Sequence, residues 1–160
     1  MRTVRTKVYK FEELSKVYQD RIIEMFRDTL EFNYWQFNED AEQIGLELNE
    51  IDLDNHILKT TLSKTLSDSI EAVLVNHGQE CETYKVAFEF KKRLDTLNSL
   101  DILDRYEGDD YELMQSYKRG LSSCYLDMLQ NQYAYEISEK GILDMIENNE
   151  YEFLSDGRLY

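Results

Sequence analysis

The sequence lacks proline altogether, and it contains two cysteines and six glycines that are scattered singly. The absence of proline excludes polyproline linkers and cis-proline turns. Scattered glycines exclude a glycine-rich loop of the kind that cradles phosphates. Cys81 and Cys124 lie far apart in the sequence, which is typical of reduced cytoplasmic thiols and not of a secreted disulfide framework.

Long apolar runs are also missing. No stretch of about 18 uncharged apolar residues occurs, which excludes a membrane-spanning helix. The segment of residues 1–7 carries a net positive charge, but polar and charged residues follow where a signal peptide needs an apolar stretch. We therefore expect a cytoplasmic location and no contact with a membrane.

Acidic side chains outnumber basic ones in the sequence. Asp and Glu number 33 against 18 Lys and Arg, which gives a net charge of -15. Hydrophobic residues make up 42% and aromatic residues 12% of the chain, too much for a disordered acidic tail. The length of 160 residues is typical of one domain. We expect a single compact acidic domain over residues 1–160, with a loose tail at 155–160.

The charge is distributed unevenly. Residues 1–30 carry seven basic and five acidic side chains, whereas residues 31–160 carry eleven and 28. Such a field opposes direct binding of nucleic acid and favours a protein partner with a basic surface. Two acidic stretches contain the residues that we expect to bind this partner: Glu39, Asp40, Glu42, Glu47, Glu50, Asp52, Asp54, Glu107, Asp109, Asp110 and Glu112. A third acidic stretch covers residues 136–156, and we rank it below the other two as a binding face.

Hydrophobic spacing predicts an α+β fold, with about six helices packed against a small antiparallel sheet of three to four strands. We expect helices over residues 15–32, 34–44, 66–77, 81–97, 110–137 and 138–146, and a short helix or turn over 100–106. Strands are expected over 4–9, 46–54, 56–62 and 151–154. Leu48 and Ile51 differ in parity, which predicts a β-bulge near Asn49. One core should contain Ile22, Phe26, Leu30, Ile44, Leu74, Phe88, Leu129 and Ile146.

No group of residues has the pattern of an active site. His77 and Cys81 are four residues apart, but Gly78 lies between them and zinc needs four ligands. We expect a helix-end histidine and a buried cysteine there, with no metal, no cofactor and no catalytic residues. Neither cysteine has the basic setting of a nucleophilic thiolate. Among 33 carboxylates a catalytic acid pair would go unrecognised, so an enzyme stays a third alternative.

The strand expected near residue 50 carries the most specific acidic pattern. Glu50, Asp52 and Asp54 alternate along it, so their side chains should lie ~6.6 Å apart on one face. A nucleic-acid duplex carries one phosphate per ~3.4 Å of each strand. The row would therefore imitate part of the charge of a nucleic-acid backbone.

Several short segments over nearly the whole chain resemble one family. They occupy residues 7–15, 39–46, 51–54, 76–78, 81–85 and 149–157. Together they resemble a family of small bacteriophage and prophage proteins, often labelled as an antitoxin of a toxin–antitoxin stability system. Where its members follow the Asp-Leu-Asp segment with Arg-Gly, this chain has Asn55 and His56. The resemblance implies a phage origin, a location in the host cytoplasm and a role against a host protein.

Anti-CRISPR and anti-restriction inhibitors share this profile, because they too are small, acidic, phage-borne and non-enzymatic. The sequence therefore predicts a phage-encoded, anti-CRISPR-like inhibitor that sterically blocks a nucleic-acid-handling bacterial defence protein. The alternative is an antitoxin that neutralises a basic toxin. Antitoxins usually pair a DNA-binding module with a disordered segment, and the sequence indicates neither.

Overall fold

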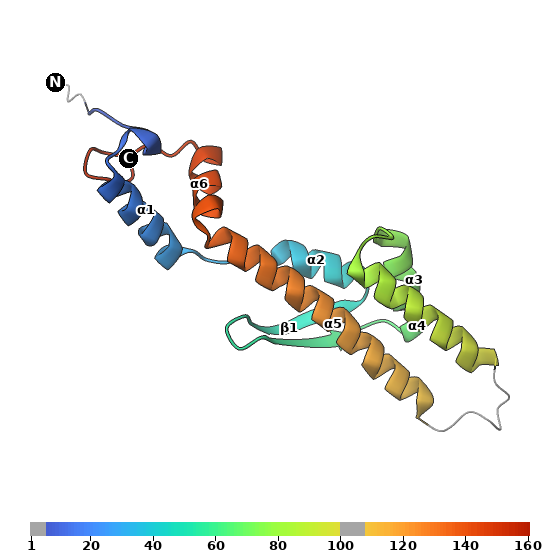
Figure 1. The fold of residues 1–160 in the computed structure, drawn as a ribbon. Helices are drawn as coiled ribbons and strands as arrows, with labels where there is room; N and C mark the ends of the chain where they lie inside the picture. Colours follow the sequence, from blue (N-terminus) through green and yellow to red (C-terminus); the bar gives the residue numbers. More distant parts are fainter. Residues whose placement is uncertain (1–5, 100–107) are drawn as a thin grey trace, which may run out of the picture. The chain divides into compact units, whose positions relative to one another are not determined.

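The computed structural model describes residues 6–99 and 108–160. Over these residues the chain forms six α-helices, a short 3-10 helix and one two-stranded antiparallel sheet (Figure 1). The α+β class is therefore confirmed, but the sheet has two strands in place of the expected three to four. The chain divides into two compact units, which are described separately: unit 1 comprises Met1–Phe32 and Asn131–Tyr160, and unit 2 comprises Asn33–Gln130.

Unit 2 contains the sheet and most of the helices. Its elements are α2 (Trp35–Gln43), β1 (Leu46–Asp52), β2 (Ile57–Leu62), α3 (Leu66–Asn76), α4 (Glu82–Ser99) and the part of α5 (Asp109–Glu136) up to Gln130. The β1–β2 hairpin lies beside α5 (Figure 1). The hydroxyls of Thr60 in β2 and Ser122 in α5 are 2.6 Å apart. Ala41, Ile44, Leu46, Ile70, Val73, Ala87, Tyr117, Leu121 and Tyr125 form its buried core.

The hairpin contains the predicted β-bulge. Leu48 pairs with Thr60 and Glu50 pairs with Lys59, so Asn49 is the extra residue on β1. An extra residue restores the alternation after the bulge, so Leu46, Leu48 and Ile51 face one side. Glu47 and Glu50 consequently face the other side. The bulge thus keeps the acidic side chains on the solvent side of the hairpin.

Unit 1 is smaller. It contains the 3-10 helix η1 (Phe11–Glu13), α1 (Lys16–Thr29), the end of α5 and α6 (Glu139–Asn148). Leu14, Ile22, Ile23, Ile142, Ile146 and Phe153 form its buried core.

The strands expected at 4–9 and 151–154 reduce to single bridges in the described residues. The backbone amides and carbonyls of Tyr9 and Phe153 exchange two hydrogen bonds of 2.8 Å, and Phe153 also bridges to Leu159. Phe153 is fully buried in the unit 1 core, but among the described residues these isolated bridges do not extend into a continuous ladder, so no strand forms there. Residues 155–160 turn back on this segment, because Leu154 N donates to Arg158 O at 2.7 Å.

The eight residues expected in one core do not form a single core. Ile44 belongs to the core of unit 2, whereas Ile22 and Ile146 belong to that of unit 1. Phe88 is 44% exposed, so its expected place in a core is wrong. Helix α4 instead buries the neighbouring Ala87, which turns the Phe88 ring outward against Lys92, 4.4 Å from its centroid. The short helix expected over 100–106 lies outside the described residues.

Replacing Gly141 with alanine should destabilise the fold. Gly141 lies in the first turn of α6, where its N–H donates to the capping hydroxyl of Ser138 at 3.0 Å. A Cβ atom there would lie 2.1 Å from the carbonyl oxygen of Tyr135, so the backbone would have to move. We expect Gly141→Ala to lose about 2–3 kcal/mol of unfolding free energy in urea titrations. Gly78→Ala is the control, because its Cβ would meet only Cys81 Sγ at 3.9 Å. Equal stability of the two variants would contradict this packing.

Candidate functional site

One face of α2 combines exposed acid with an exposed tryptophan. Ala41 and Ile44 lie on the buried side of this segment and belong to the core of unit 2. Trp35, Glu39 and Glu42 follow at spacings of four and three residues, which places them together on the opposite side. Trp35 is 50% exposed, and both glutamates are exposed. We call these three residues the α2 acidic face.

The carboxylates of this face have no cationic partner in the described part of the chain. Neither Glu39 nor Glu42 forms an ion pair or a side-chain hydrogen bond there. Glu42 also lies in the last turn of α2, where the helix dipole disfavours negative charge. Lys64 Nζ occupies the helix end itself, 2.5 Å from the carbonyl oxygen of Gln43. The position of Glu42 therefore does not stabilise the helix, and its charge is available to a partner.

Asp40, on the same helix, is half-exposed, and its carboxylate is engaged within unit 2. Its carboxylate accepts a hydrogen bond of 2.5 Å from the hydroxyl of Tyr125. His77 Nε2 lies 3.6 Å from the other carboxylate oxygen, and His77 Nδ1 lies 2.7 Å from Thr83 Oγ1. Burial, followed by this hydrogen bond, raises the pKa of Tyr125 above its usual range. Asp40 thus holds α2 against α3, α4 and α5, and this fixes the orientation of the exposed face.

The expected row of three acids on one strand is not formed. Strand β1 ends at Asp52, and Asp54 lies in the turn that follows. Glu50 forms an ion pair of 2.6 Å with Lys59, the residue opposite it on β2. Hydrogen bonds from the side chain and backbone of Asn55 hold the pKa of the Asp52 carboxyl below its usual value. Two of the three charges are thus already engaged within the hairpin.

The other predicted partner residues lie on two elements. Glu47 is exposed on β1, opposite Thr61, so no cation faces it across the strands. Asp110 and Glu112 are exposed in the first turn of α5. Glu107 and the side chain of Asp109 lie outside the described residues.

Histidine and cysteine form no reactive pair here. No group of three or more His, Cys, Asp or Glu side chains is arranged to hold a metal ion within the described residues. Cys81 is exposed, so its expected burial is wrong, since α4 turns Thr83 inward in its place. Burial raises the pKa of the half-buried Cys124 thiol, which disfavours the thiolate. No helix among the described residues is long and apolar enough to cross a membrane.

No protein-family model, no curated protein and no solved structure matches this chain. The resemblance to small phage proteins therefore stays a prediction.

Trp35 is the functional candidate that sequence reasoning missed. It is the single tryptophan of the chain, and it precedes two acids at helical spacing within a region from 33 to 58 that contains no Lys or Arg. That combination of one aromatic side chain and acids on the polar side of a helix was the signal available. It would have selected Glu39 and Glu42 from the larger acidic stretch.

Proposed function

We propose that this chain is a phage-encoded, non-catalytic inhibitor that binds a basic surface of a nucleic-acid-handling bacterial defence protein. It would act in the host cytoplasm as an anti-CRISPR-like protein, by sterically blocking the surface that its target uses for nucleic acid. The observation that carries the proposal is the α2 acidic face, where two unpaired carboxylates follow the exposed Trp35 on the same side of the helix. The phage origin rests on the resemblance of the sequence segments.

The chemistry of this face fits arginine. A guanidinium can stack on the indole of Trp35 while its N–H groups donate to a carboxylate, and both interactions strengthen as water is excluded. Tryptophan and arginine are also the residues most enriched among those that dominate interface energies. Because Asp40 and the buried Ile44 fix α2, little conformational entropy should be lost when a partner binds.

Charge provides the long-range part of the interaction. The net charge of -15 steers a basic partner toward the chain and repels nucleic acid from it. A bound chain would therefore exclude nucleic acid from a basic channel both by its volume and by its field.

An antitoxin is the second candidate function, and the label of the family that the sequence resembles favours it. An acidic face with an exposed tryptophan would neutralise a basic ribonuclease toxin by the same contacts. The two functions differ in the partner and in the phenotype, since only an antitoxin rescues cells from a toxin.

The experiment that tests the proposal is capture of the partner from lysates of bacteria that carry defence systems. The wild-type chain serves as one bait and Glu39→Lys/Glu42→Lys as the matched bait. We expect a nucleic-acid-binding protein that only the wild-type bait retains, and we expect preloaded nucleic acid to prevent its capture. A partner that binds both baits equally, or that binds the chain and nucleic acid together, would contradict the proposal. Capture of a toxin, with rescue of growth, would favour the antitoxin.

A further inference from the structure

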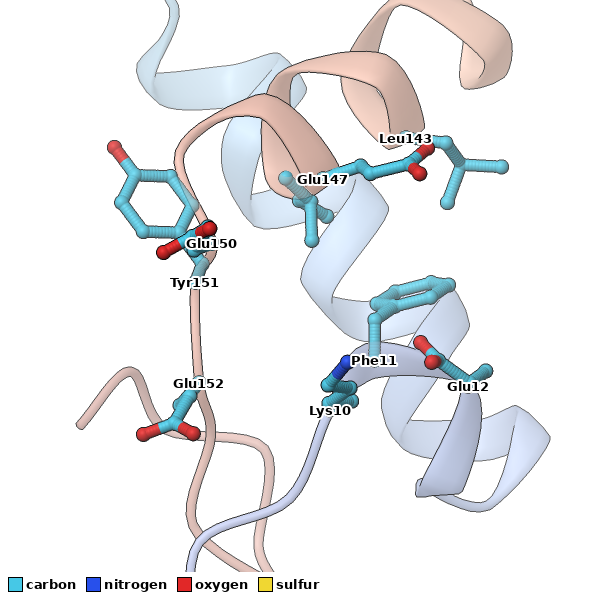
Figure 2. Close-up of a pocket in the computed structure, with 9 residues that line it drawn as sticks. Lys10, Phe11, Glu12, Leu143, Glu147, Glu150, Tyr151 and Glu152 are labelled. Carbon is cyan, nitrogen blue, oxygen red and sulfur yellow. The ribbon is translucent and has the colours of Figure 1, made fainter.

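Unit 1 contains a groove that is separate from the α2 acidic face. Its volume is about 900 Å³. Figure 2 shows its three sides: Leu143 and Glu147 from α6, Glu150 to Glu152 from the segment after α6, and Lys10 to Glu12 from the N-terminal segment. The groove therefore lies within one compact unit.

The two aromatic residues of the apolar lining pack against other aromatic residues of unit 1. The apolar lining consists of Phe11, Leu143, Ile146 and Tyr151. The Phe11 ring packs edge-on against the buried Phe153, with ring centroids 6.3 Å apart. Tyr151 stacks on Phe26 with centroids 5.7 Å apart. Both lining rings are only half-buried, so part of each remains available to a ligand.

The polar part of the lining is strongly acidic. It carries four glutamates, Glu12, Glu147, Glu150 and Glu152, against the single cation of Lys10. All four are exposed, and none forms an ion pair or a side-chain hydrogen bond with another described residue. We call the four apolar lining residues the apolar floor and the four glutamates the acidic rim. A groove lined by both, with more acidic than basic charge, is complementary to a ligand that is apolar on one side and cationic on the other.

Glu150 is an unexpected residue for its backbone position. It lies just beyond the C-cap of α6 with a φ of +52°, in the left-handed region where helices usually place glycine or asparagine. Glycine would suit this backbone better, so folding does not account for the carboxylate. This offers a substitution that removes a rim charge without straining the fold.

We propose that this groove binds an extended peptide segment of a partner protein in which arginine or lysine alternates with apolar residues. Alternate side chains of an extended segment point to opposite sides. The apolar ones would contact Phe11, Leu143 and Tyr151, while the basic ones reach the glutamates at the rim. The lining charge excludes anionic segments and nucleic acid by repulsion. This site involves no residue of the α2 acidic face and does not rest on the function proposed above.

The test is fluorescence anisotropy of a labelled, terminally blocked octapeptide of alternating arginine and leucine, titrated with the full chain. We expect saturable binding. An octapeptide of arginine and serine should bind at least 10-fold more weakly, because it lacks contacts with the apolar floor. An octapeptide of glutamate and leucine should bind at least 10-fold more weakly as well, because the rim repels it. Failure to bind the arginine–leucine peptide, or equal binding of the arginine–serine peptide, would overturn the proposal.

Two double variants separate the groove from the general acidity of the chain. Glu147→Gln/Glu150→Gly should weaken binding of the arginine–leucine peptide at least 10-fold, with a melting temperature that is no lower than that of the wild type. Glu71→Gln/Asp95→Asn removes the same charge from exposed positions on α3 and α4, outside both proposed sites, and should weaken binding less than 2-fold. Equal losses in the two double variants, or no loss in the first, would overturn the assignment to this groove.

Discussion

Reversing Glu39 and Glu42 to lysine should weaken binding of the captured partner about 100-fold at low salt. Each substitution removes an unpaired carboxylate from the α2 acidic face and places a cation opposite a basic surface. Like charges brought together at an interface cost several kcal/mol, and about 3 kcal/mol corresponds to 100-fold. Isothermal titration calorimetry or surface plasmon resonance with the purified partner measures the effect. The loss should shrink as salt screens both charges.

The control for this prediction carries the same change in charge elsewhere in unit 2. Glu71 and Asp95 are exposed on α3 and α4, and Glu71→Lys/Asp95→Lys should weaken binding by less than 10-fold. A lysine triple at Glu50, Asp52 and Asp54 should also have a smaller effect than the α2 variant, because Lys59 already compensates Glu50. If either set weakens binding as much as the α2 reversal, the partner responds to net charge and not to this face.

Alkaline pH should unfold the protein through two buried tyrosines. Tyr117 and Tyr125 are fully buried in unit 2, and burial raises the pKa of Tyr117 to about 12 and that of Tyr125 further. The unfolded chain has tyrosine pKa values near 10, so above this pH the unfolded state binds fewer protons than the folded state. Stability is therefore fully retained below about pH 10 and falls as the pH rises, with a loss of about 2 kcal/mol from Tyr117 alone at pH 12.

The measurement is urea unfolding from pH 9 to 12, combined with tyrosinate absorbance. Tyr117→Phe keeps the ring in the core while Ser69 Oγ still donates to Ile44 O at 2.7 Å, so this variant should lose less stability with rising pH. Tyr111→Phe is the control, because Tyr111 is 63% exposed and should leave the pH dependence unchanged. A wild-type stability that stays constant between pH 10 and 12 would contradict the role assigned to these tyrosines.

Local sequence signals were sufficient to predict elements whose position depends on neighbouring residues alone. The change of parity between Leu48 and Ile51 located the β-bulge, and Ser138 marked the start of α6. The expected strands at 4–9 and 151–154 failed because alternation shows only that a strand is possible. Whether one forms depends on a partner segment, and in the described residues these segments form only the single bridges Tyr9–Phe153 and Phe153–Leu159.

The candidate site was predictable only in part, for a related reason. Composition identified the acidic stretch, but the sequence does not distinguish a carboxylate that is paired in the fold from one that is free. The structural role of Asp40 requires Tyr125, 85 residues away, and the neutralisation of Glu50 requires Lys59 on the facing strand. Long-range contacts thus decide which charges remain free, and among the acids of α2 they leave Glu39 and Glu42.

The most direct measurement on the α2 acidic face is the fluorine NMR spectrum of the chain labelled with 5-fluorotryptophan. Trp35 is the single tryptophan, so the labelled chain gives one resonance that reports on this face alone, even beside a large unlabelled partner. Burial of Trp35 under a basic surface predicts that the resonance shifts and loses its sensitivity to solvent D₂O as the partner saturates the chain. Sedimentation would verify saturation independently. An unchanged, solvent-sensitive resonance in the saturated complex would show that the partner binds elsewhere.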